Sequence, residues 1–164
     1  MDADLVAMES RSGRRPLVVV GVDGSTSGLR AVRWAAPRAS EMGAVLQILV
    51  AWLPPTPMIP ALVDGHEEGA ARAHEYAQRA EQVASDEAPE LAIETEVIEL
   101  PPIQALMDAS RNADLLVVGR RGLGGLRGLL LGSVSQHCAE HAHCPVAIIP
   151  ESGEWDAIRQ YSAG

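Results

Sequence analysis

Apolar residues fall in short runs that predict a buried sheet. Four of these runs are almost entirely apolar, and they span residues 16–23, 44–52, 114–118 and 145–150. Strands without polar alternation are typical of parallel sheets that are covered on both faces. A fifth run, at residues 91–98, alternates instead and places Glu94 and Glu96 on one face, which indicates an edge strand.

Helical patterns fill the intervals between these runs. We expect helices at about residues 29–42, 67–87, 102–109 and 133–143. Pro102 suits the first position of its helix, and Ser133 is expected to cap the last one. The buried side of the second helix is predicted to follow Ala71, His74, Ala77, Ala80 and Val83. Regular alternation of strand and helix predicts a parallel sheet with helices on both faces.

A glycine-rich loop joins the fourth strand to the last helix. After the apolar run ends at Gly119, the loop contains Arg120, Arg121 and Arg127 among further glycines and ends at Gly132. Glycine lets the backbone approach a ligand closely, and N–H groups at the start of a helix bind anions. The loop therefore suggests a phosphate site, although an ordinary connection with solvated arginines has a similar composition.

The 164-residue chain is predicted to form one domain. We expect a flexible arm at residues 1–15, one folded domain at 16–150 and a polar tail at 151–164. The proline-rich stretch at residues 54–60 is interpreted as a stiff linker, with a lid beside a pocket as the alternative. Because the chain lacks phenylalanine, we expect a core of Val, Leu, Ile and Ala.

Charge and composition exclude several classes of partner. A formal net charge of -9 and a pI of about 4.9 oppose binding to nucleic acid or to an anionic membrane surface. Every basic residue is arginine, so a P-loop lysine is impossible. No run reaches the ~20 apolar residues of a membrane span. Residues 1–15 contain no apolar signal-peptide core, so we expect a cytoplasmic protein.

Two cysteines and three histidines lie close together near the end of the chain. His137 and His141 share one face of the predicted helix, a spacing that can bind zinc, but paired CxxC motifs are missing. Cys138 fits the inward face of the same helix as a small apolar residue. We therefore favour a buried structural cysteine over a metal site.

The sequence lacks common motifs of nucleotide-dependent and hydrolytic enzymes. There is no G-x-x-x-x-G-K-[ST] loop, no G-x-G-x-x-G after the first strand and no G-x-S-x-G elbow. No convincing general base accompanies the glycine loop. We therefore expect ligand binding without efficient turnover and assign no catalytic residue.

The spacing within the glycine loop is more specific than its composition. Gly119-x2-Gly122-x9-Gly132-Ser133 resembles the G-2x-G-9x-G-(S/T) motif of the universal stress protein family. The resemblance extends to residues 20–25 at the first strand and to residues 143–149 at the last one. It implies a flavodoxin-like (Rossmann-like) doubly wound α/β fold, with a five-stranded parallel sheet of strand order 3-2-1-4-5 and helices on both faces.

The resemblance also implies a function. The branch of the family that carries this motif binds ATP, and the implied cofactor is ATP, with or without Mg²⁺. It further implies a homodimer that pairs through the final strand at residues 145–150, and a regulatory role in stress responses.

Matching positions assign roles to individual residues. The resemblance places Gly21, Val22, Asp23 and Ala51 on the adenine side of the site. It places Gly119 and Arg120 near the ribose and the α-phosphate. The phosphates would be held by Gly122, Gly132, Ser133, Val134 and Ser135. Asp23 has an alternative role as a turn or helix-cap residue.

One departure from the family pattern concerns the rim of the site. Leu100 stands where family members commonly have glycine, before the third helix. A bulkier residue there can reshape the rim without closing the pocket.

Three other functions remain open from the sequence. The chain could be a weak ATPase, a protein-interaction dimer that retains the motif only for folding, or a flavin-binding protein. The flavin alternative is disfavoured because aromatic residues make up only 3% of the chain and no stacking partner is expected near the loop.

Overall fold

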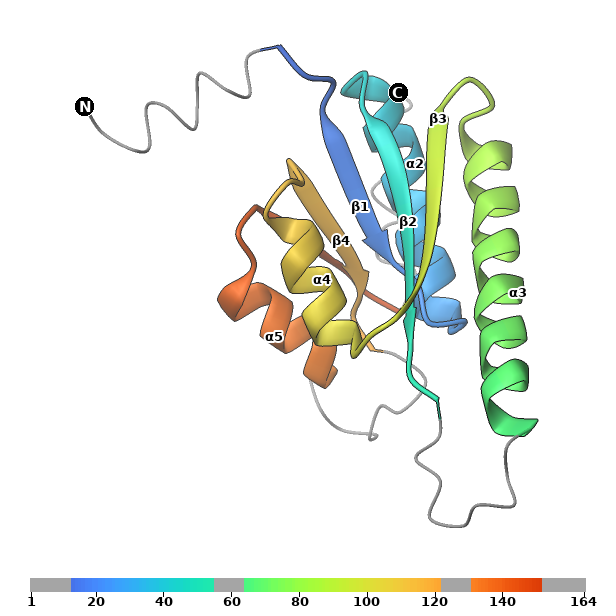
Figure 1. The fold of residues 1–164 in the computed structure, drawn as a ribbon. Coiled ribbons are helices and arrows are strands. Elements are labelled where there is room, and N and C mark those ends of the chain that lie inside the picture. Colours follow the sequence, from blue (N-terminus) through green and yellow to red (C-terminus); the bar gives the residue numbers. More distant parts are fainter. Residues whose placement is uncertain (1–12, 55–63, 122–130, 152–164) are drawn as a thin grey trace.

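The computed structural model describes residues 13–54, 64–121 and 131–151. Its strands are β1 (Leu17–Gly21), β2 (Val45–Trp52), β3 (Ala92–Glu99), β4 (Leu115–Gly119) and β5 (Val146–Ile149). They form one parallel sheet in the order β3-β2-β1-β4-β5 (Figure 1). The predicted flavodoxin-like strand order is therefore confirmed.

Helices cover both faces of the sheet. Those in the described part of the chain are α2 (Thr26–Glu41), α3 (Asp64–Glu87), α4 (Pro102–Ser110) and α5 (Ser133–His141). α2 and α3 pack on one face, and α4 and α5 pack on the other (Figure 1). The alternation of strand and helix along the sequence produces this two-sided arrangement.

The sheet separates two hydrophobic cores. Val18 and Val20 contribute to the core beneath α2 and α3, whereas Val19 and Leu116 contribute to the core beneath α4 and α5. Successive residues of a strand point to opposite faces, so one apolar run supplies both cores. Among the described residues, the largest fully buried side chains are mainly Val, Leu and Ile, which confirms the expected aliphatic core.

The buried side of α3 differs from its prediction. The helix contacts the core through Ala73, Ala77, Ala80 and Ala84. Ala71 and His74, which were expected to face inward, are exposed. A spacing of three residues drifts by about 60° per step around a helix of 3.6 residues per turn, whereas alternating steps of four and three stay on one face.

The start of α5 also differs by one residue from its prediction. Gly132 is the N-cap residue, with φ -72° and ψ 162°, and Ser133 is already helical. Glycine has no side chain that can bond to the first turn. The N–H groups of that turn are therefore available to another acceptor.

Several predicted features lie outside the described residues. These are Gly122, Arg127, residues 1–12 of the arm, residues 152–164 of the tail and residues 55–60 of the proline-rich stretch.

β3 and β5 form the two edges of the sheet. The edge position of β3 confirms the prediction from its alternating pattern. β5 pairs with β4 on one side only, so its other side is an open edge in the described chain. None of the described helices has the length and apolar character that crossing a bilayer requires.

Candidate functional site

A cavity of about 740 Å³ lies at the carboxyl ends of β1, β2 and β4. β1 and β4 are neighbours in the sheet although β2 and β3 separate them in the sequence. The strand order therefore reverses beside β1, and doubly wound folds bind ligands at such a crevice. Asp23 and Gly119 both line this cavity, as the sequence predicts for neighbouring first and fourth strands.

Asp23 organises the turn after β1. Its Oδ1 accepts a hydrogen bond from the Ser25 N–H at 3.0 Å. Ser25 caps α2, because its Oγ accepts a hydrogen bond from the Gly28 N–H at 3.0 Å. Gly24 lies between them with φ 82°, a conformation that favours glycine. The turn role that the sequence offers as an alternative is therefore real, and the same residue also lines the cavity.

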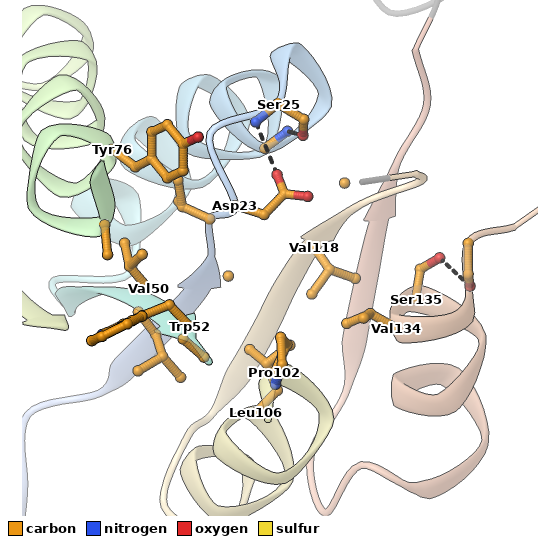
Figure 2. Close-up of a pocket in the computed structure, with 18 of the residues that line it drawn as sticks. Asp23, Ser25, Val50, Trp52, Tyr76, Pro102, Leu106, Val118, Val134 and Ser135 are labelled. Atoms are coloured by element: carbon orange, nitrogen blue, oxygen red, sulfur yellow. Dashed lines mark hydrogen bonds between the residues drawn. The ribbon is translucent and has the colours of Figure 1, made fainter. Parts of the chain in front are cut away.

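The end of the cavity beside β2 is apolar. Figure 2 shows side chains from β2, α3, α4 and β4 around it, namely Val50, Trp52, Tyr76, Leu106 and Val118. Such a wall suits the face of a planar base. Trp52 and Tyr76 come from distant parts of the sequence. The fold therefore brings aromatic rings to the cavity, on the side across from the start of α5.

The Trp52 indole packs against α3. Its ring lies edge-on to the His66 ring, with 5.1 Å between the ring centroids. His66 Nε2 lies 3.0 Å from Glu99 Oε2, which links α3 to the end of β3. A Cβ atom on Gly69 would be 2.9 Å from the Trp52 indole, so the ring packs directly against the helix. These contacts hold the indole in one place at the cavity wall.

Main-chain groups organise the opposite end of the cavity, where β4 meets α5. The Arg120 N–H donates to the Ile149 carbonyl at 2.9 Å, and the Arg120 carbonyl accepts from the Gly132 N–H at 2.9 Å. The Ser135 hydroxyl donates to the Arg120 carbonyl at 2.8 Å and lies 3.0 Å from the Gly132 carbonyl oxygen. Arg120 and Gly132 are thereby brought together beside the cavity.

Gly119 is required by close packing. A Cβ atom at this position would overlap Ser27 Oγ and lie 2.8 Å from the Ser27 carbonyl oxygen. The first turn of α2 therefore rests directly on the end of β4. The first glycine of the motif has a structural reason that is independent of any ligand.

α5 begins at the cavity wall. Gly132, Ser133 and Val134 line the cavity, and Ser133 is exposed. Figure 2 shows Val134 and Ser135 across the cavity from Trp52 and Tyr76. The N-terminus of a helix presents N–H donors and the positive end of its dipole, which favours an anion. The cavity thus has an apolar end and an end that faces the first turn of α5.

Nine of the eleven predicted site residues line this one cavity: Gly21, Val22, Asp23, Ala51, Gly119, Gly132, Ser133, Val134 and Ser135. Arg120 is not among the described lining residues, and Gly122 lies outside the described part of the chain. Arg121 lines the cavity instead of Arg120. The sequence placed both arginines in the loop, but only the fold determines which one faces the cavity.

Leu100 is not among the described residues that line the cavity. It packs with the core beneath α4 and α5 and lines a separate groove of about 360 Å³. Pro102 contributes to the wall of the main cavity at this side. Leu100 therefore does not form part of the described cavity wall.

Cys138 is fully buried, as predicted. Burial raises the pKa of its thiol to about 11, and the neighbouring Cys144 adds to the increase. The rings of His137 and His141 lie 4.5 Å apart between centroids. In the described ranges, no three side chains of His, Cys, Asp or Glu are grouped as metal ligands.

Fold and cavity together define a doubly wound α/β protein with its ligand cavity at the switch point of the sheet. The chain belongs to the universal stress protein family, whose profile matches residues 15–150. A universal stress protein of Mycolicibacterium smegmatis is 35% identical over 139 residues, which cover 80% of this chain and 47% of that protein. The chain spans about half the length of the curated relatives it matches.

Solved structures of the family are similar to this chain. A universal stress protein in complex with cAMP is 33% identical, with a TM-score of 0.67 over 84% of this chain and 98% of that chain. The universal stress protein UspA of Lactobacillus plantarum is 26% identical, with a TM-score of 0.71 over 84% of this chain and 99% of that chain.

Proposed function

We propose that this chain is an ATP-binding regulatory module that acts as a dimer in stress responses and binds its nucleotide without efficient turnover. One observation carries the proposal: the start of α5 at Ser133 and the apolar wall at Trp52 belong to the same cavity. One end of the cavity suits a base and the other suits phosphates. A cavity of about 740 Å³ has the size of a typical small-molecule site.

The adenine group is proposed to bind at the ends of β1 and β2. The Asp23 carboxylate accepts a hydrogen bond from the amino group of the base, because an ionised carboxylate is an acceptor only. Gly21, Val22 and Ala51 form the adjacent wall, and Ala51 contacts the base through its backbone. Trp52 then covers one face of the base.

The phosphates are proposed to bind at the start of α5. Ser133 and Val134 offer N–H groups, and Ser133 adds a hydroxyl donor. The Gly132 N–H already donates to the Arg120 carbonyl, so we assign Gly132 the close approach of the backbone to the phosphates. Gly122 belongs to the same proposed cradle, with Gly119 and Arg120 near the ribose and the α-phosphate.

Ser135 has a different part in this proposal. Its hydroxyl already donates to the Arg120 carbonyl and lies 3.0 Å from the Gly132 carbonyl oxygen. We therefore assign its hydroxyl to the shape of the loop and its N–H to the phosphates. An accompanying Mg²⁺ would be held mainly by phosphate oxygens and water, as is common for this ion.

The cAMP complex of the 33% identical relative supports an adenine nucleotide as the class of ligand. ATP is the finer choice within that class, and it rests on the glycine motif. The proposal also places the chain in the cytoplasm, where adenine nucleotides are abundant.

Equilibrium titration calorimetry with ATP, AMP and cAMP tests the proposal. We expect ATP to bind the wild-type chain, and we expect the double variant Gly122→Ala/Gly132→Ala to lose roughly tenfold or more in affinity, since the added Cβ atoms hold the phosphates away from the backbone and weaken bonds to a charged group. Gly13→Ala is the matched control, because no atom lies within 4 Å of a Cβ atom there. Equal affinity in the double variant and the control would show that the loop does not bind the phosphates.

The proposed dimer pairs through β5, which is an open edge of the described sheet. Lysine on an edge strand opposes pairing with another chain. We expect Ala147→Lys to weaken the dimer in sedimentation experiments, whereas Gln136→Lys on exposed α5 surface leaves it intact. A wild-type chain that sediments as a monomer at high concentration would contradict this part of the proposal.

A further inference from the structure

Arg121 has an incompletely bonded head group at the cavity. The residue lines the cavity, and its side chain is 23% exposed. Its Nη2 donates to Glu151 Oε2 at 3.0 Å. Its Nε is buried and has no hydrogen-bond partner among the described residues. A guanidinium carries five N–H donors in a fixed plane, so this contact leaves donor capacity at the cavity wall.

Backbone contacts hold Arg121 beside α2 and β5. The Arg121 N–H lies 3.5 Å from Ser27 Oγ, and the preceding Arg120 N–H bonds to the Ile149 carbonyl. Ile149 ends β5, and Glu151 follows it by two residues. The Arg121–Glu151 pair therefore joins the cavity wall to the end of β5. The glutamate is the more exposed partner, at 43%.

Phosphate and carboxylate compete for the same kind of donor. Guanidinium groups bind both anions through parallel N–H bonds, and a phosphate in the cavity would supply the acceptor that the buried Nε lacks. A charged phosphate is the stronger ligand because it brings more negative charge and more acceptor oxygens. Glu151 can leave for solvent at low cost because it is exposed.

We propose that Arg121 binds a phosphate group of the nucleotide and that Glu151 competes for the same guanidinium, so that nucleotide binding releases Glu151 at the end of β5. This inference rests on the proposed nucleotide function and adds a regulatory contact to it. In the nucleotide-free protein the Glu151 carboxylate is bonded to the Arg121 guanidinium, and in the nucleotide-bound protein this bond is broken. Occupancy of the cavity is thereby communicated to the edge strand.

Titration calorimetry with ATP tests the competition. Glu151→Gln is expected to tighten ATP binding by about two- to fivefold, the range that corresponds to an exposed ion pair. Arg121→Gln is expected to weaken binding by roughly tenfold or more, because a charge-assisted bond is lost. In the Arg121→Gln background, the added Glu151→Gln change is expected to have no further effect.

Glu41→Gln is the matched control for the change in charge. Glu41 forms an exposed pair with Arg38 at 2.8 Å near the far end of α2. That helix is about 24 Å long, so its C-terminal end is more than a Debye length from the cavity. The control is expected to bind ATP with wild-type affinity.

The Arg121 Nε–Hε resonance in NMR gives a direct second measurement. It is assigned by its loss in Arg121→Gln, and we expect it to move downfield when ATP is added because the Nε acquires an acceptor. Wild-type affinity in Glu151→Gln, or the same tightening when Arg121 is absent, would overturn the inference. If the wild-type chain binds ATP while either result is obtained, only the competition fails; if it binds no nucleotide, the proposed function fails as well.

Discussion

The Ser135 hydroxyl donates a hydrogen bond to the Arg120 carbonyl at 2.8 Å, and this bond ties the first turn of α5 to the end of β4. Ser133, two residues earlier, is exposed at the cavity, whereas Ser135 is only 3% exposed. Two serines of one short motif therefore have different tasks. One faces the proposed phosphates and the other holds the loop in shape.

Alanine substitutions should separate these two tasks. Ser135→Ala is expected to lower the free energy of unfolding by about 1 kcal/mol, because it removes a buried hydrogen bond. Ser133→Ala is expected to change it by less than about 0.5 kcal/mol but to weaken ATP binding. Urea unfolding and calorimetry measure the two effects. A stable Ser135→Ala variant beside a destabilised Ser133→Ala variant would reverse the assignment.

Gly119→Ala is expected to destabilise the protein by about 1–3 kcal/mol, because the new Cβ atom overlaps the backbone of Ser27. Gly21→Ala serves as the comparison. Its Cβ atom would meet the Leu106 side chain at 3.0 Å, and a side chain can move aside. We therefore expect the smaller loss of stability in Gly21→Ala. Equal losses in urea unfolding would refute the close contact between β4 and α2.

Trp52→Leu is expected to weaken binding of adenine nucleotides by roughly fivefold or more, in line with the strength of base–aromatic stacking. Trp34→Leu is the control, since Trp34 packs near Arg38 on α2 and does not line the described cavity. Tryptophan fluorescence gives an independent signal. Nucleotide should change the emission of the Trp34→Leu variant and leave that of Trp52→Leu largely unaltered.

The pKa of Cys138 predicts loss of stability at alkaline pH. Its pKa is 9.0 for the unperturbed thiol and about 11 in the folded protein, so above pH 9 the unfolded chain loses this proton first. The contribution of Cys138 to the free energy of unfolding is fully present below pH 9. It is lost as the pH rises toward 11, and over this range the free energy of unfolding falls by roughly 1.4 kcal/mol per pH unit. Urea unfolding at several pH values measures it.

A thiol reagent checks the same environment at neutral pH. Cys144 is half-buried and is expected to react before Cys138, which is fully buried and remains protonated. Faster labelling of Cys138 in the native protein would contradict this expectation.

Sequence patterns predicted most of the secondary structure because buried strands and helices need apolar residues at characteristic spacings. The apolar runs at β1 and β2 admit few alternatives to a doubly covered strand, and Glu94 and Glu96 marked β3 as an edge. The buried side of α3 was harder to predict. Alanines occur on both sides of that helix, since Ala71 is exposed and Ala73 is buried, so composition alone did not show which alanines face the core.

The sequence by itself determined the order of the elements, the aliphatic core and the loop between β4 and α5, because local periodicity and glycine spacing encode them. Tertiary structure alone decided that Trp52 and Tyr76 form one wall of the cavity and that Arg121, rather than Arg120, faces it. It also decided that Glu151 lies against this arginine. These relationships depend on how distant segments pack, and no local pattern records contacts between residues that lie on different elements of the fold.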